Sequence, residues 1–208
     1  MRALLILALL IPTTATAQIA PGSSGSSTLH TYGHREAMSV LAEFGTCYAS
    51  RSRTSAFELL ATRPGSVEEA KVYKQLFRAQ NQSCLSLTSE LRVSYPMVRG
   101  AIGEGMYHKA IAVPANLAVS TAPTADNVRN FGDAALCYAG ANPARIHALA
   151  QTRVGSKEEL EAIEALLPTM GSCFPPNAQK MPEMSATLMR FRLTEALWKL
   201  GKTPEGAR

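Results

Sequence analysis

An internal repeat limits the possible folds of this chain more than any other feature. Cys47-Tyr48-Ala49 recurs as Cys137-Tyr138-Ala139, 90 residues later. Thr62-Arg63-Pro64-Gly65-Ser66 recurs as Thr152-Arg153-Val154-Gly155-Ser156 at the same spacing. Repeats of this length, in the same order, indicate two tandem copies of one structural unit.

Each copy has the residue pattern of a small helical bundle. Apolar residues spaced three or four apart place one face of a first helix against a core: Met38, Leu41, Phe44 and Tyr48. Ser66 with Glu69, and Ser156 with Glu159, predict a capping box at the start of a later helix in each copy. Aromatic residues are only 6% of the chain, so alanine and leucine build the core, which favours helices. The predicted fold is all-α, with two helical-bundle repeats packed about a pseudo-two-fold axis.

The first residues are typical of an export signal. Arg2 precedes an apolar run from Ala3 to Ile11, and Ala15 and Ala17 form a small-residue cleavage site. The run is shorter than the roughly 20 residues that span a bilayer. Residues 1–17 are therefore predicted to be a cleaved signal peptide, and the mature protein is expected to be periplasmic or secreted, without a membrane span.

The remaining chain divides at its polar and proline-rich stretches. We expect a flexible N-terminal segment at 18–33, a first repeat at 34–109 and a linker at 110–123. The second repeat is expected at 124–201, with a flexible tail at 202–208. The net charge of the full chain is only +5, and basic residues are not interleaved with aromatics, so a nucleic-acid partner is not expected.

The four cysteines are divided equally between the copies. In an oxidising compartment they are expected to form disulfides, and four cysteines allow three pairings. Duplication selects Cys47 with Cys84 and Cys137 with Cys173. The chain has no C-x-x-C motif and no close Cys/His pairing of the zinc type, so structural bridges are favoured over redox or metal chemistry.

Other candidates for chemistry are isolated. His30 and His34 have a spacing that can chelate a metal on a helix, but Gly33 lies between them and the second copy lacks them. No nucleophile turn of the G-x-S-x-G type is present. Arg51 and Arg53 could bind an anion, although a solvated loop explains them equally well. No metal and no cofactor is therefore expected.

Two polar pairs recur on an otherwise apolar helix. Arg99 and Glu104 in the first copy return as Arg190 and Glu195 in the second. The two glutamates could act as paired carboxylates, but structural ion pairs are the favoured interpretation. Residues five apart lie on different sides of a helix, so their partners are expected on other helices.

The sequence favours a non-catalytic interaction or structural module of the periplasm or secreted space. Its expected partner is an unidentified protein or an envelope polymer, contacted through a groove between the copies. Two alternatives stay open: an envelope hydrolase that uses Glu104 and Glu195, and a small-molecule carrier, which needs an enclosed apolar cavity. The oligomeric state is not predicted.

Overall fold

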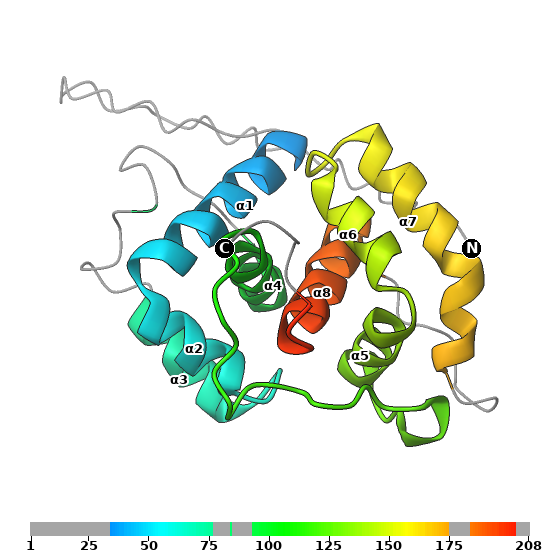
Figure 1. The fold of residues 1–208 in the computed structure, drawn as a ribbon. Helices are drawn as coiled ribbons and strands as arrows, with labels where there is room; N and C mark the ends of the chain where they lie inside the picture. Colours follow the sequence, from blue (N-terminus) through cyan, green and yellow to red (C-terminus); the bar gives the residue numbers. More distant parts are fainter. Residues whose placement is uncertain (1–33, 77–83, 85–92, 175–183, 203–208) are drawn as a thin grey trace, which may run out of the picture.

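The computed structural model describes residues 34–76, 84, 93–174 and 184–202. The predicted signal peptide at 1–17, the predicted flexible segment at 18–33 and residues 203–208 of the predicted tail lie outside this part. Within the described residues the chain forms eight α-helices and no strand (Figure 1). The prediction of an all-α protein is therefore confirmed for these residues.

Four helices form the first half of the described chain. They are α1 (His34–Arg51), α2 (Arg53–Ala61), α3 (Val67–Leu76) and α4 (Tyr95–His108). Helix α4 follows Ser94, and Pro96 lies in its first turn, where a missing backbone N–H costs nothing.

The second half of the described chain also contains four α-helices. They are α5 (Phe131–Ala141), α6 (Pro143–Gln151), α7 (Lys157–Met170) and α8 (Ala186–Lys199), with short 3₁₀ turns at Ala125–Asn127 and Gly171–Cys173. Helix α8 ends in a Schellman-type turn, because Gly201 has a φ of +67° and its N–H donates to the carbonyl of Trp198.

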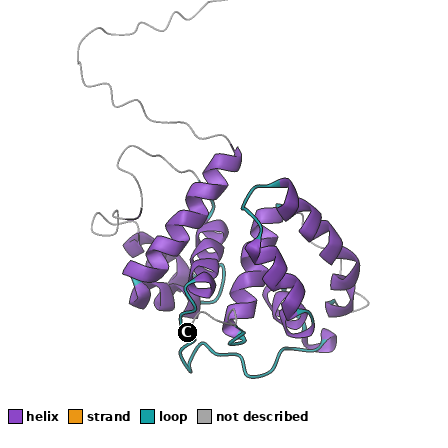
Figure 2. Cartoon of the chain, turned by 45° about the horizontal axis from the view of Figure 1, so that its top comes forward, coloured by secondary structure: helices purple, strands orange, loops and turns teal. Residues whose placement is uncertain are grey.

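Helices α4 and α8 lie side by side at the centre of the molecule. Helices α1–α3 cover α4 and helices α5–α7 surround α8, as both ribbon views show (Figures 1 and 2). Every residue of α4 from Met97 to Tyr107 is buried, charged ones included. The two central helices therefore form the part of the structure where the halves meet.

Glycines allow close contacts on α4. A Cβ on Gly105 would lie 2.3 Å from the carbonyl oxygen of Gly45 on α1. A Cβ on Gly100 would lie 2.5 Å from the Cβ of Phe191 on α8. Only glycine leaves room for the neighbouring helix at these two positions.

The predicted capping boxes form only in part. The Oγ atoms of Ser66 and Ser156 accept from the N–H groups of Glu69 and Glu159, at 3.1 and 3.2 Å. The glutamate carboxylates, however, accept from the preceding glycines, Gly65 at 2.7 Å and Gly155 at 2.8 Å. The serine N–H groups already donate to the carbonyls of Arg63 and Arg153, so they cannot serve the glutamates. The prediction was right for the bonds to the serine Oγ atoms. It was wrong for the second bond of the capping box, from the serine N–H to the glutamate carboxylate.

The two disulfides are Cys47–Cys84 and Cys137–Cys173, which confirms the predicted pairing. They close loops of 37 and 36 residues, with Cα–Cα distances of 5.6 and 5.8 Å. Loops of this size give an entropic stabilisation of about 4 kcal/mol each in the chain-entropy model. In each half the bridge joins the first helix to a residue beyond the third.

The segment after α4 packs along the central helices. Ile111 and Leu117 are buried, and the indole Nε1–H of Trp198 donates to the carbonyl of Ile111 at 2.7 Å. The N–H of Val119 donates to the carbonyl of Lys199 at 2.9 Å. Among the described helices, none is both long enough and apolar enough to cross a bilayer.

Candidate functional site

Arg99 is completely buried at the centre of the first of two charge clusters. Its Nε donates to Glu195 Oε1 on α8 at 3.1 Å, and its Nη1 donates to Glu69 Oε1 on α3 at 3.0 Å. Its Nη1 and Nη2 also donate to the carbonyls of Leu59 and Leu60, both at 2.9 Å. We call Arg99, Glu69 and Glu195 the first clasp.

Arg190 occupies a matching place in the second cluster. Its Nε donates to both carboxylate oxygens of Glu104 on α4, at 3.0 and 2.9 Å. Its Nη1 donates to the Thr152 carbonyl, and its Nη2 to the Ala150 carbonyl, both at 2.9 Å. Its Nη1 lies 3.8 Å from Glu159 Oε1. We call Arg190, Glu104 and Glu159 the second clasp.

Local backbone structure explains why an arginine stands at each place. The last carbonyls of a helix have no intrahelical partner, and a cation there also compensates the negative end of the helix dipole. Arg99 supplies donors to the end of α2, and Arg190 supplies donors to the end of α6. Each arginine therefore holds a helix end in its own half and a glutamate in the other half.

The cross-half glutamates are ionised in the folded protein. Burial alone would raise the pKa of Glu195, but the charges of Arg99, Lys199 and Arg192 outweigh it and hold that pKa well below its usual range. Burial also opposes ionisation of Glu104, and a hydrogen bond from His108 together with the charge of Arg190 lowers its pKa. Neither carboxyl group is suited to donate a proton at neutral pH.

In the described part of the structure the two glutamates line different hollows. Glu104 lines a hollow beside α1, whereas Glu195 lines a hollow beside α5. They are 3% and 5% exposed, and each is bound to an arginine. Both carboxylates are therefore engaged in ion pairs.

The second clasp is less completely paired than the first. Glu159 is 2% exposed, and its Oε1 has no hydrogen-bond partner in the described part of the structure. Its other oxygen accepts from Thr187 Oγ1 at 3.1 Å. Burial raises the pKa of Glu159, and the charge of Arg190 only partly offsets this.

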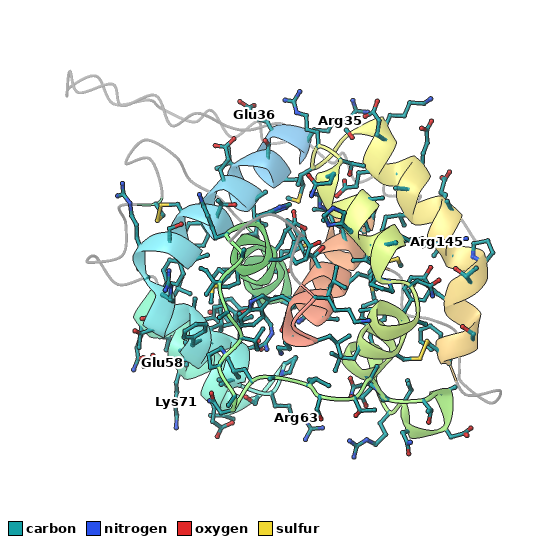
Figure 3. All side chains as sticks on the ribbon, viewed as in Figure 1. Arg35, Glu36, Glu58, Arg63, Lys71 and Arg145 are labelled. Carbon is teal, nitrogen blue, oxygen red and sulfur yellow. A yellow bond between two sulfur atoms is a disulfide. The ribbon has the colours of Figure 1, made fainter. Side chains whose placement is uncertain are left out.

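A groove runs between α1 and the segment that joins α6 to α7. It consists of two adjoining hollows of about 550 and 680 Å³ that share Ser39, Glu43 and Val154. At one end of the groove lie Glu104 and Arg190 of the second clasp, together with the neighbouring His108. At the other end, Arg35 and Glu36 begin α1 beside the α6–α7 turn (Figure 3). We call this the α1 groove.

A smaller hollow of about 220 Å³ lies where α5, α8 and the turn between α2 and α3 meet. Glu195, Arg192 and Lys199 line it from α8, and Arg63 lines it from the turn. We call it the α5 cleft. Neither the groove nor the cleft is an enclosed apolar chamber, because charged side chains line both.

The other sequence candidates are not brought into a common site. His30 lies outside the described residues, and of His34 only the backbone, at the start of α1, is described. Arg51 and Arg53 are exposed. His147 contacts the hydroxyl of Tyr107 at 2.5 Å, and burial raises the pKa of that tyrosine to about 12. Across the described residues, no group of three or more His, Cys, Asp and Glu side chains could hold a metal ion.

Sequence reasoning missed part of each clasp. It assigned Glu69 and Glu159 only to helix capping, whereas both also face a buried arginine. The signal available in the sequence was that Glu69 and Glu159 recur together with Arg99 and Arg190. A glutamate that only caps a helix needs no partner 30 residues away. Lys199 and Arg192 contact Glu195, but the first half has His108 and Ala101 at the positions that match them in the sequence.

Comparison of the chain with models of protein families, with curated proteins and with solved structures finds no match.

Proposed function

We propose that this protein is a non-catalytic interaction module of the periplasm or secreted space, which contacts a partner through the α1 groove. The observation that carries this proposal is the position of the repeated polar residues. They are buried in clasps that join the two halves, while the groove between the halves is left open.

Tandem duplication and pseudo-two-fold packing are part of the same proposal. Arg99 of the first half binds Glu195 of the second, and Arg190 of the second binds Glu104 of the first. This exchange is what a two-fold axis between α4 and α8 produces. Gly100 packs on Phe191, the residue at its own repeat position. A small residue facing a large one at matched positions is compatible with two copies that diverged and stayed packed together.

The disulfides support an exported location. Structural disulfides form and persist in oxidising compartments, and both bridges of this protein are in place. With the clasps they make a rigid support for the walls of the groove. A rigid groove lowers the entropy lost when a partner binds.

The lining of the α1 groove favours a polypeptide partner over a polysaccharide. Hydroxyl groups of Ser39, Thr46 and Ser50, and charges of both signs, line its walls. Among the described residues that line the groove, the imidazole of His108 is the single aromatic ring, whereas sugar rings generally pack their apolar faces on aromatic side chains. An extended segment that carries both donors and acceptors fits such a surface.

Site-specific photo-crosslinking of the exported protein tests the proposal. A photoreactive residue at Ser39, in the groove, is compared with one at Glu164, which is exposed on α7 and outside the groove. We expect one discrete protein adduct from position 39 and none of that mass from position 164. The adduct should also form with the purified partner after its identification.

Two results would contradict the proposal. Equal adduct patterns from both positions would show that the groove has no preferred partner. Hydrolysis of wall polymer by the purified protein, abolished by Glu104→Gln or Glu195→Gln in a correctly folded variant, would instead support the hydrolase alternative.

A further inference from the structure

The α5 cleft has an unusual balance of charge at its base. Glu195 forms ion pairs with three cations: Arg99 Nη2 at 3.0 Å, Lys199 Nζ at 2.9 Å and Arg192 Nη1 at 3.3 Å. One carboxylate cannot neutralise three positive charges. Glu69 compensates one of them by its own bond to Arg99. Arg192 and Lys199 line the cleft, so the uncompensated charge faces it.

Arg63 adds a further positive charge at the mouth of the cleft. It lies in the turn between α2 and α3, its side chain is exposed, and it makes no ion pair within the described part of the chain (Figure 3). Asp133 is the other carboxylate in the lining, and Arg129 pairs with it at 3.7 Å. The cleft and its ion-paired neighbours therefore hold five cations against three carboxylates: Arg63, Arg99, Arg129, Arg192 and Lys199 against Glu69, Asp133 and Glu195.

The corresponding part of the α1 groove lacks this excess. By the sequence repeat, His108 stands where Lys199 is, and Ala101 stands where Arg192 is. The carboxylates Glu43, Glu104 and Glu159 surround Arg190 and Lys109 there. This part of the groove thus has two cations against three carboxylates, so the cations of the α5 cleft are not a requirement of the clasp itself.

The amino end of α5 also borders the cleft. Its Asp133 N–H already donates to the side chain of its N-cap residue, at Asn130 Oδ1. The argument for an anion site therefore rests on the three cationic side chains that line the cleft.

We propose that the α5 cleft binds a small, doubly charged oxyanion of the phosphate class, held by Arg63, Arg192 and Lys199. An excess of two positive charges matches a dianion. Guanidinium groups bind phosphate oxygens through two parallel hydrogen bonds, as they also bind carboxylates, so the second negative charge is what favours phosphate over acetate here. The cleft volume of about 220 Å³ equals the share of roughly seven water molecules, enough for a phosphate group with some of its hydration. This site is separate from the α1 groove, so the proposal does not depend on the function proposed for the groove.

Titration of the oxidised mature protein with inorganic phosphate tests the proposal. Binding is followed by calorimetry and by backbone amide NMR shifts at low ionic strength, near pH 8, where phosphate is a dianion. We expect saturable one-to-one binding, with shifts concentrated at residues 63, 133 and 192–199. Acetate at the same concentration should bind much more weakly. Titration with glycerol 3-phosphate distinguishes a phosphate ester from free phosphate as the ligand. Binding equal to that of inorganic phosphate indicates recognition of a terminal phosphate group, and weaker binding indicates free phosphate.

Arg63→Gln and Arg153→Gln form a matched pair of variants. Both positions are exposed, and the repeat places them in equivalent turns. Loss of a charge-assisted contact should weaken phosphate binding about tenfold in Arg63→Gln, while Arg153→Gln keeps the affinity of the unmodified protein. Lys199→Gln should also weaken it, with circular dichroism to check the fold. Absence of saturation, equal weakening by Arg153→Gln, or shifts centred elsewhere would overturn the proposal.

Discussion

Replacement of Arg190 by methionine should be among the most damaging single changes in this protein. The change removes the donors at Nε, Nη1 and Nη2. It leaves Glu104 buried at 3% exposure beside the imidazole of His108, which is 3.4 Å away. Breaking a buried ion pair in this way costs about 3–5 kcal/mol. The carbonyls of Ala150 and Thr152 also lose their donors. Against a typical domain stability of about 5–15 kcal/mol, this is a large fraction.

A double-mutant cycle separates the lost pair from the lost packing. Glu104→Leu removes the orphaned carboxylate, so Arg190→Met with Glu104→Leu should be more stable than Arg190→Met alone. We expect a coupling free energy of about 1–3 kcal/mol from the four proteins of the cycle. The assay is equilibrium unfolding in urea, followed by circular dichroism, with the disulfides intact and the m-values compared.

Two outcomes would refute this reasoning. Arg190→Met could leave the free energy of unfolding within about 0.5 kcal/mol of the original value, as typical surface changes do. The double variant could also show simple additivity, which would mean that Arg190 and Glu104 stabilise the fold independently.

Three further predictions follow from the same contacts. Glu69→Gln should destabilise the protein by about 1.5–3 kcal/mol, since Glu69 binds Arg99 at 3.0 Å. Glu159→Gln should be neutral or stabilising near pH 7, because burial raises the pKa of Glu159. Urea unfolding of the two variants compares their free energies of unfolding. Gly105→Ala should lower the melting temperature, since its Cβ would lie 2.3 Å from a backbone oxygen, while Gly171→Ala, with open space around it, should leave that temperature unchanged or raise it. Stability should also fall in acid. The lowered pKa values of Glu104 and Glu195 provide stabilisation that is present above a pH of about 4.3 and is lost as the pH drops below it. Equilibrium unfolding measured from pH 7 to pH 2 would show no such loss if the clasps were unimportant.

The helices and the disulfides could be predicted because their signals are local or repeated. The spacing of Met38, Leu41, Phe44 and Tyr48 places them on one face of α1, and all four are buried. Ser66 and Ser156 cap α3 and α7 as predicted. The cysteine pairing followed from the recurrence of Cys47 as Cys137, because equivalent units require equivalent bridges.

The clasps could be predicted only in outline. The spacing of Arg99 and Glu104 predicted partners on other helices. Glu195 and Arg190 do lie on α8, but Glu104 also contacts His108 on its own helix. It could not show that each arginine binds a glutamate of the other half, because that depends on how α4 and α8 cross. The α5 cleft was not predicted, since Arg63 and Lys199 are far apart in the chain and only folding brings them to one hollow.

The sequence by itself determined the helical class, the cap serines and the disulfide framework. The helices depend on the spacing of nearby residues, and the disulfide pairing was readable from the recurrence of Cys-Tyr-Ala at 47–49 and 137–139. Tertiary structure alone decided the roles of the charged residues. A buried arginine needs several acceptors in three dimensions, and here those acceptors come from helix ends in its own half and from a carboxylate in the other. The packing of α4 against α8 therefore makes Glu104 and Glu195 part of the support of the fold, and it leaves the α1 groove and the α5 cleft as the open surfaces.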